Sequence, residues 1–152
     1  MRYYFDHIND FIKRLKEFNP TIKIIGVDPI GSILGGGTEI KPYEVEGIGY
    51  DFFPKVLDNS LIDQYIKVSD QDSLQMARRL VREEGLLCGG SSGSAVVGAL
   101  QATQNLQQGQ RALIILPDSI RNYLTKHVDN GWMHSHGFLA ESSNDSQTKS
   151  KS

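Results

Sequence analysis

The stretch that decides the fold class is Leu86-Leu87-Cys88-Gly89-Gly90-Ser91-Ser92-Gly93-Ser94-Ala95. An apolar dipeptide leads into glycines and serines, and small residues at helical spacing follow as far as Leu106. This order predicts a tight turn that opens a helix. The hydroxyls and the free N–H groups of such a helix start can bind a polar or anionic group. The alternative interpretation is a glycine-rich turn with a serine N-cap.

Outward from this turn, short apolar runs alternate with amphipathic segments. Ser69 and Asp72 form a capping box at the start of a predicted helix, and Gly85 is a natural C-terminal stop for that helix. The alternation predicts an α/β fold, an open parallel sheet with flanking helices and right-handed crossovers. The predicted strands are residues 22–27, 64–68 and 112–116, and the predicted helices are residues 4–18, 69–84, 89–106 and 119–128.

A long irregular stretch, residues 30–63, separates the first two predicted strands. Loops of this length inside a compact domain are usually functional or disordered, and its aromatic residues argue against simple disorder. Its segment Gly47-Ile48-Gly49-Tyr50-Asp51-Phe52 could wall a pocket, or could pack its aromatic rings on the core. Ligands of parallel sheets bind beyond the carboxyl ends of strands, which predicts that Asp28, the Gly89–Ser91 turn and Asp118 share one rim.

Composition narrows the class of protein. The chain has 152 residues, 39% of them hydrophobic, with a net charge of -2 and a pI of about 6.1. These values exclude wholesale disorder and argue against a nucleic-acid binder, because such domains carry a basic excess that neutralises phosphates. The single cysteine cannot form an internal disulfide, and no apolar run approaches the roughly 20 residues that span a bilayer. The chain start resembles no signal or transit peptide, so a soluble cytoplasmic protein is expected.

Three further candidates have simpler structural explanations. Asp28 follows a strand, as does the ribose-binding carboxylate of a dinucleotide site, but no G-x-G-x-x-G precedes it, so a solvated strand end is favoured. His134 and His136 lack carboxylate or thiol partners, which favours surface histidines and no metal site. Cys88 has no basic neighbour to lower its pKa, so a small buried residue is favoured over a nucleophile.

Four blocks together resemble the C-terminal half of the catalytic core of cystathionine β-synthase. They are KIIGVDP (23–29), YEVEGIGYDFFPKVLD (43–58), EEGLLCGGSSGSA (83–95) and ILPDSIRNYLTKHVDNGWMHSHGF (115–138), in an order and spacing that cover roughly residues 13–139. Cysteine synthase, a related family, shares the VEGIG and SSG patterns. The resemblance implies part of a tryptophan-synthase-β-like core, the type II fold of pyridoxal-phosphate enzymes. It assigns residues 1–139 to a partial catalytic domain and residues 140–152 to a disordered polar tail.

The resemblance also implies chemistry. Family members use pyridoxal 5'-phosphate to replace the β-hydroxyl of L-serine with the thiol of L-homocysteine, a step of transsulfuration. Ser91 matches the serine that bonds the pyridine nitrogen of the cofactor, with Gly89 and Gly90 beside it. Gly47 and Gly49 match the loop next to the cofactor, Ile48 and Tyr50 its substrate side, and Asp118 a residue that supports Ser91.

Other parts of the family pattern have no match here. The Schiff-base lysine, the asparagine loop that grips the substrate and the phosphate-binding loop are missing, and MRYYFDHIND stands where the phosphate loop belongs. The expectation is a truncated protein with no catalytic residue and no covalent cofactor, inactive alone. The alternatives are a non-catalytic partner of full-length subunits in a homo- or hetero-oligomer, a cysteine-synthase-like enzyme, and a nucleotide-binding domain that uses Asp28 and the Gly89–Ser91 turn.

Overall fold

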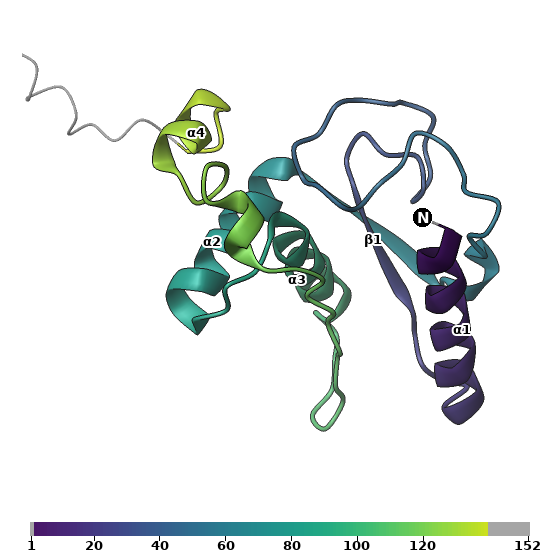
Figure 1. The fold of residues 1–152 in the computed structure, drawn as a ribbon. Helices are drawn as coiled ribbons and strands as arrows, with labels where there is room; N and C mark the ends of the chain where they lie inside the picture. Colours follow the sequence, from purple (N-terminus) through teal and green to yellow (C-terminus); the bar gives the residue numbers. More distant parts are fainter. Residues whose placement is uncertain (1, 140–152) are drawn as a thin grey trace, which may run out of the picture.

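The computed structural model describes residues 2–139, and the backbone alone of residues 2–7. The sheet lies between α3 on one side and α1 on the other, and α2 and α4 lie on the α3 side (Figure 1). The elements in chain order are α1 (Arg2–Phe18), β1 (Ile25–Pro29), the 3-10 helix η1 (Asn59–Leu61), β2 (Gln64–Val68), α2 (Asp70–Glu84), α3 (Gly90–Ala102), the 3-10 helix η2 (Ile120–Tyr123) and α4 (Asn130–Ser135).

The sheet consists of the parallel pair β1 and β2, in a register from Ile25 opposite Gln64 to Pro29 opposite Val68. The strand predicted over residues 64–68 is confirmed. The strand predicted over residues 22–27 is shifted, because its partner begins only at Gln64. Before that point Ile24 is held by a side chain, its N–H donating to Asp63 Oδ2 at 2.8 Å.

The predicted ends of α2 are confirmed. Ser69 is the N-cap, its Oγ accepting from Asp72 N at 3.1 Å and donating to Asp72 Oδ2 at 2.7 Å. Gly85 ends the helix in the left-handed region, with φ 68°. The polar first turn and the glycine stop therefore set both boundaries locally, without help from tertiary packing.

Helix α3 packs closely on α2 and on the sheet. A Cβ at Gly93 would collide with the carbonyl oxygen of Ser73, and a Cβ at Gly98 would lie 2.5 Å from Val27 Cγ2. Ser94 Oγ donates to Ser73 Oγ at 2.8 Å across the α2–α3 contact. Two glycines therefore let α3 approach both neighbours.

Three sequence-based predictions are wrong. Residues 112–116 are extended but belong to no described strand, and Leu113 is 82% and Ile115 63% exposed. Residues 119–128 form η2 and successive turns instead of an α-helix, and α4, which follows them, was not predicted. Helix α3 ends at Ala102, short of Leu106.

A small apolar core joins the long loop to α2 and α4. Val45, Leu74 and Met133 are buried in it, and Ile48, Trp132 and Phe138 pack against them. Residues 30–63 are irregular apart from η1, as expected. Among the described residues, no helix is long and apolar enough to cross a bilayer. The tail assigned to residues 140–152 lies outside the described part of the chain.

Candidate functional site

The start of α3 has no side-chain cap. Its N-cap is Gly89, in an extended conformation with φ -82° and ψ 176°, so the alternative of a serine N-cap is wrong. Within residues 2–139, the N–H groups of Gly90 and Ser91 have no hydrogen-bond acceptor. The turn is nevertheless interior, because Ser91 is 5% and Ser92 0% exposed. This arrangement leaves a positive helix end with donors that a bound acceptor could use.

Asp118 lies directly against the turn. The Gly89 N–H donates to the Asp118 backbone oxygen at 3.2 Å, and Tyr123 Oη donates to Asp118 Oδ2 at 2.5 Å. A Cβ at Gly89 would collide with Asp118 Oδ1 and would lie 2.7 Å from Tyr123 Cε2. The glycine thus makes room for the protein's own carboxylate and ring, and the predicted proximity of Asp118 to the Gly89–Ser91 turn is confirmed.

Several polar atoms around this turn are buried without a described partner. They are Ser92 Oγ, Asp118 Oδ1 and both ring nitrogens of His127. The Ser91 hydroxyl likewise makes no hydrogen bond to a described residue. Buried polar groups normally find partners, since an unsatisfied one costs about 1–3 kcal/mol. The free Ser91 hydroxyl is therefore available to a polar ligand bound at the turn.

Burial controls the ionisation of the groups around the turn. Burial and the Asp118 carboxylate raise the pKa of Tyr123, so its hydroxyl stays a donor. Burial raises the pKa of the Cys88 thiol, and Cys88 is 4% exposed, which confirms the interpretation of a small buried residue. Burial and the nearby Arg78 lower the pKa of His127, so its ring is neutral at pH 7.

The loop from Gly47 to Tyr50 packs mainly on the core. Ile48 packs against the cluster of Val45 and Leu74, and a Cβ at Gly49 would lie 2.5 Å from Pro29 Cγ. The Tyr50 N–H donates to Ser32 Oγ at 2.9 Å, and the Tyr50 ring meets that of Phe52 edge-on, with centroids 5.1 Å apart. Gly49 and Tyr50 also line a cleft with residues 40–43.

Leu74 connects this loop to the turn. It shares the buried cluster with Val45, and its Cδ2 would lie 2.9 Å from a Cβ at Gly90. Lys126, which follows η2, forms an ion pair with Glu46. The Gly47–Tyr50 loop and the Gly89–Ser91 turn are therefore neighbours that share a contact with Leu74. The two described clefts do not include Gly89, Gly90 or Ser91.

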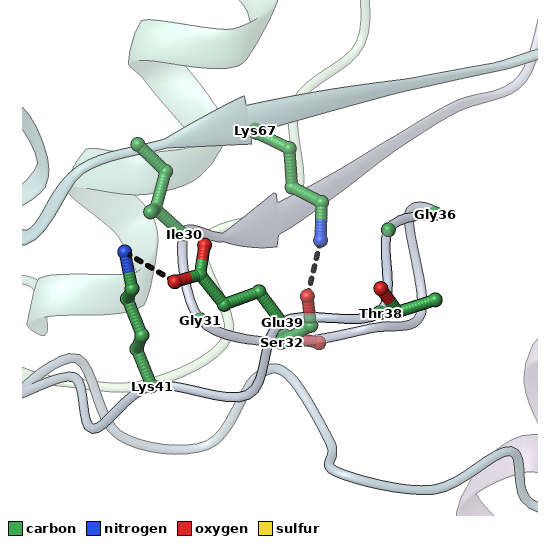
Figure 2. A pocket seen from close by; sticks show the side chains of 9 residues that line it. Ile30, Gly31, Ser32, Gly36, Thr38, Glu39, Lys41 and Lys67 are labelled. Carbon is green, nitrogen blue, oxygen red and sulfur yellow. Dashed lines mark hydrogen bonds and ion pairs between the residues drawn. The ribbon is translucent and has the colours of Figure 1, made fainter.

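Asp28 lies elsewhere and is not a solvated strand end. It is 2% exposed, accepts from Gly35 N at 2.8 Å and pairs with Lys67 Nζ at 2.5 Å. Lys67 reaches from β2 toward the Ser32 carbonyl at one side of a cavity of about 200 Å³ (Figure 2). The glycine-rich loop and the Lys41–Glu39 pair form the other side. Of the groups predicted to share one rim, Asp118 lies beside the Gly89–Ser91 turn, whereas Asp28 lies elsewhere and forms an ion pair with Lys67.

Sequence reasoning missed Lys67, Tyr123 and His127. For Lys67 a signal existed, since it alternates with Ile66 and Val68 on a strand beside Asp28. His136 is exposed and stacks on Trp132 at 4.0 Å, while His134 is half-buried. Within residues 2–139, no three histidine, cysteine or acidic side chains gather as a metal site would require.

Comparison with known proteins places this architecture in a family. Residues 9–118 match the family model described as "Pyridoxal-phosphate dependent enzyme". The chain therefore belongs to the pyridoxal-phosphate dependent enzymes. It is similar to cystathionine beta-synthase of Apis mellifera, 56% identical over 131 residues, which are 84% of this chain and 26% of that protein. It is also similar to cystathionine beta-synthase of Dictyostelium discoideum, 52% identical over 136 residues, 87% of this chain and 27% of that protein.

A solved structure has the same fold. The O-acetylserine dependent cystathionine beta-synthase from Helicobacter pylori superposes with a TM-score of 0.70 and 45% identity, covering 76% of this chain and 37% of that one. The resemblance to cystathionine β-synthase and the α/β fold class of a partial type II core are thus confirmed. The chain spans about a quarter of the length of the curated relatives it matches.

Proposed function

We propose that this chain supplies the pyridine-nitrogen end of a pyridoxal-phosphate site of the cystathionine β-synthase type. The observation that carries the proposal is the hydroxyl of the buried residue Ser91, which has no described partner, at the uncapped start of α3. Ser91 would bond the ring nitrogen. Gly89 and Gly90 would lie beside the ring, their lack of a Cβ lets Asp118 and Leu74 pack against the turn, and the Asp118 backbone oxygen accepts the Gly89 N–H.

The cofactor, when bound, supplies an electron sink for charge that develops at the α-carbon of an amino-acid substrate. The residue at its ring nitrogen sets the strength of that sink. A neutral hydroxyl such as Ser91 does not hold the nitrogen protonated as a carboxylate would. A moderated sink favours replacement at the β-carbon of L-serine by a thiol such as that of L-homocysteine.

The loop Gly47–Tyr50 takes the substrate side in this proposal, with Ile48 and Tyr50 nearest the substrate. Both loop glycines have positive φ, 83° and 81°, so the backbone path there requires glycine. Residues 1–139 then act as a partial catalytic domain in the cytoplasm. No lysine of the chain lies in a block that matches the family's attachment motif, so the chain holds the cofactor without a covalent bond.

Borohydride reduction followed by peptide mass mapping tests the absence of a covalent bond. The purified chain is incubated with pyridoxal phosphate, reduced and digested. We expect scattered, substoichiometric labelling of surface lysines at a level equal to that of a heat-unfolded control. A single dominant pyridoxyl-lysine would contradict this part of the proposal.

A serine pair tests the role of Ser91. In a chimera that joins this segment to the lysine-bearing half of a relative, Ser91→Ala should retain cofactor and lose activity. The expected loss is about 1–3 kcal/mol of transition-state stabilisation, the scale of an unpaired buried polar group. Ser92→Ala is the matched control and should have a milder effect. Equal, small losses at both positions would remove the assignment.

A second function, a non-catalytic partner of full-length subunits, is favoured by the exposed apolar run at residues 112–116. Co-purification of the chain with a full-length relative would support it. A cysteine-synthase-like enzyme that takes sulfide or cysteine as the thiol is the remaining enzymatic alternative. Activity of the chimera with sulfide in place of homocysteine distinguishes the two thiols.

A further inference from the structure

We propose that Tyr123 is a positioning residue of the candidate site, whose hydroxyl holds the Asp118 carboxylate against Gly89 and thereby fixes the turn that presents Ser91. The inference rests on the function proposed above, because it concerns the same turn. It concerns a residue on η2 whose ring lies against Gly89 and whose hydroxyl bonds Asp118.

Hydrogen bonds link Tyr123 to Asp118 and Asp118 to Gly89. Tyr123 Oη donates to Asp118 Oδ2 at 2.5 Å, and Asp118 in turn accepts the Gly89 N–H on its backbone oxygen at 3.2 Å. The carboxylate and the tyrosine ring both occupy the space where Gly89 would carry a Cβ. The Tyr123 hydroxyl therefore fixes the position of the Asp118 carboxylate, and that carboxylate fixes the position of Gly89, the N-cap of α3.

Tyr123 is the single donor to this carboxylate among the described residues. Asp118 Oδ1 is buried and has no described partner, so the bond from Tyr123 Oη to Oδ2 is the one hydrogen bond of this side chain to a described residue. A hydrogen bond to a charged acceptor is stronger than one between neutral groups. Without the tyrosine hydroxyl, both carboxylate oxygens would lack a donor beside an interior turn, and the carboxylate would have to move toward water.

Tyr123 is itself fixed by its surroundings. It is 6% exposed, and its ring lies against that of His127, with centroids 5.2 Å apart. The His127 carbonyl accepts from Arg78 Nη1 of α2 at 2.8 Å. Ile120 N donates to Leu87 O at 3.0 Å, which ties the start of η2 to the segment that leads into the turn. A rigid ring can therefore transmit its position to Asp118.

Amide hydrogen exchange of the full chain tests the proposal without cofactor. Tyr123→Phe removes only the hydroxyl, and we expect exchange of the hydrogen-bonded Gly89 and Ser92 amides to accelerate by about 10-fold or more. Tyr65→Phe is the matched control, since it removes a tyrosine hydrogen bond of 2.8 Å to Asn59 on the far side of the sheet. It should leave exchange of the Gly89 and Ser92 amides unchanged. Amides of β1 and β2 report global opening and should change little in either variant.

A second variant makes the test specific to the pair. Asp118→Asn keeps an acceptor for Tyr123, so its effect on exchange of the Gly89 and Ser92 amides should be smaller than that of Tyr123→Phe. The double variant should exchange no faster than Tyr123→Phe alone, because both changes act through one bond. Unchanged exchange in Tyr123→Phe, an equal acceleration throughout the sheet, or additive effects in the double variant would overturn the proposal.

The cofactor role is measured separately, by the activities of Ser91→Ala and Ser92→Ala in the chimera loaded with pyridoxal phosphate. If both variants lose equally little activity while Tyr123→Phe still accelerates exchange at the turn, the proposed function fails and the positioning by Tyr123 stands. If Ser91→Ala loses much more activity than Ser92→Ala and Tyr123→Phe leaves exchange unchanged, the positioning fails and the proposed function stands.

Discussion

At the scale of single residues, the glycines of the α3 start have different tasks. Gly89 makes room for Asp118 and Tyr123, whereas Gly93 makes room for the backbone of α2. Both glycines let the chain approach itself closely, and Ser91 and Ser92 lie buried beside them.

Gly93→Ala should destabilise the chain strongly. Its Cβ would meet the Ser73 carbonyl oxygen and lie 2.7 Å from Ala77 N, both backbone atoms that cannot rotate away. Overpacking of this kind costs about 1–3 kcal/mol, and here the upper end is expected. Urea unfolding measures the loss. Gly131→Ala in α4 is the control, since its Cβ would meet only the Asp129 carboxylate at 3.1 Å. Equal stabilities of the two variants would contradict the argument.

His127 should make stability depend on pH. It is 1% exposed, and burial lowers its pKa below the ordinary value of 6.5, whereas the unfolded chain takes up the proton near 6.5. Stability from this residue is therefore full above pH 6.5 and falls as the pH drops below it, by at most about 1.4 kcal/mol per pH unit. Urea unfolding followed by circular dichroism between pH 7.5 and 5 measures the slope.

The matched pair for this pH effect is His127→Gln and His136→Gln. The first variant should flatten the slope, and the second, at an exposed position, should keep it. An NMR titration of the His127 ring in the wild-type chain gives an independent measure. A slope that survives His127→Gln, or a ring that titrates at 6.5 or above, would refute the prediction.

At the scale of elements, the sequence correctly predicted the helix ends that depend on residues adjacent in the chain. Ser69 and Gly85 define α2 because each acts on the helix end beside it. Ser69→Ala should cost about 1 kcal/mol by removing the acceptor for Asp72 N. Ser69→Asp keeps an acceptor and should restore most of the stability. Thermal unfolding of both variants checks this, and equal losses would show that the cap contributes nothing.

Elements that depend on a distant partner were predicted less well. The strand over residues 22–27 shifted to Ile25–Pro29 because Gln64 sets where pairing begins. Residues 112–116 have the apolar, β-branched composition of a buried strand, but no described strand pairs with them. The candidate site follows the same rule. The turn and Asp118 were predictable from motifs. Tyr123 is placed by η2 and His127 by the turns that follow it, and no hydrophobic periodicity in the sequence predicts either.

At the scale of the whole molecule, the most unusual feature is the apolar surface that stays uncovered. Leu113 is 82%, Ile115 63% and Leu87 63% exposed, and the apolar side of α1 leaves Phe18 93% exposed. Between Arg111 and Pro117, the backbone makes no hydrogen bond to the rest of the described chain. An extended apolar segment with free N–H and C=O groups is a template for pairing with another chain.

We therefore expect the 152-residue chain to self-associate through residues 112–116. Antiparallel pairing of two copies centred on Ile114 places Leu113 of one copy opposite Ile115 of the other and buries both. The net charge of -2 opposes such contact only weakly. Light scattering coupled to size exclusion should show concentration-dependent oligomers, and Leu113→Lys with Ile115→Lys should restore monomer by placing like charges across the pair. Ile40→Lys is the control, because it alters an apolar side chain of similar exposure, 58%, outside the segment. A sharp monomer peak for the wild type with cooperative unfolding, or equal rescue by Ile40→Lys, would show that this segment does not drive association.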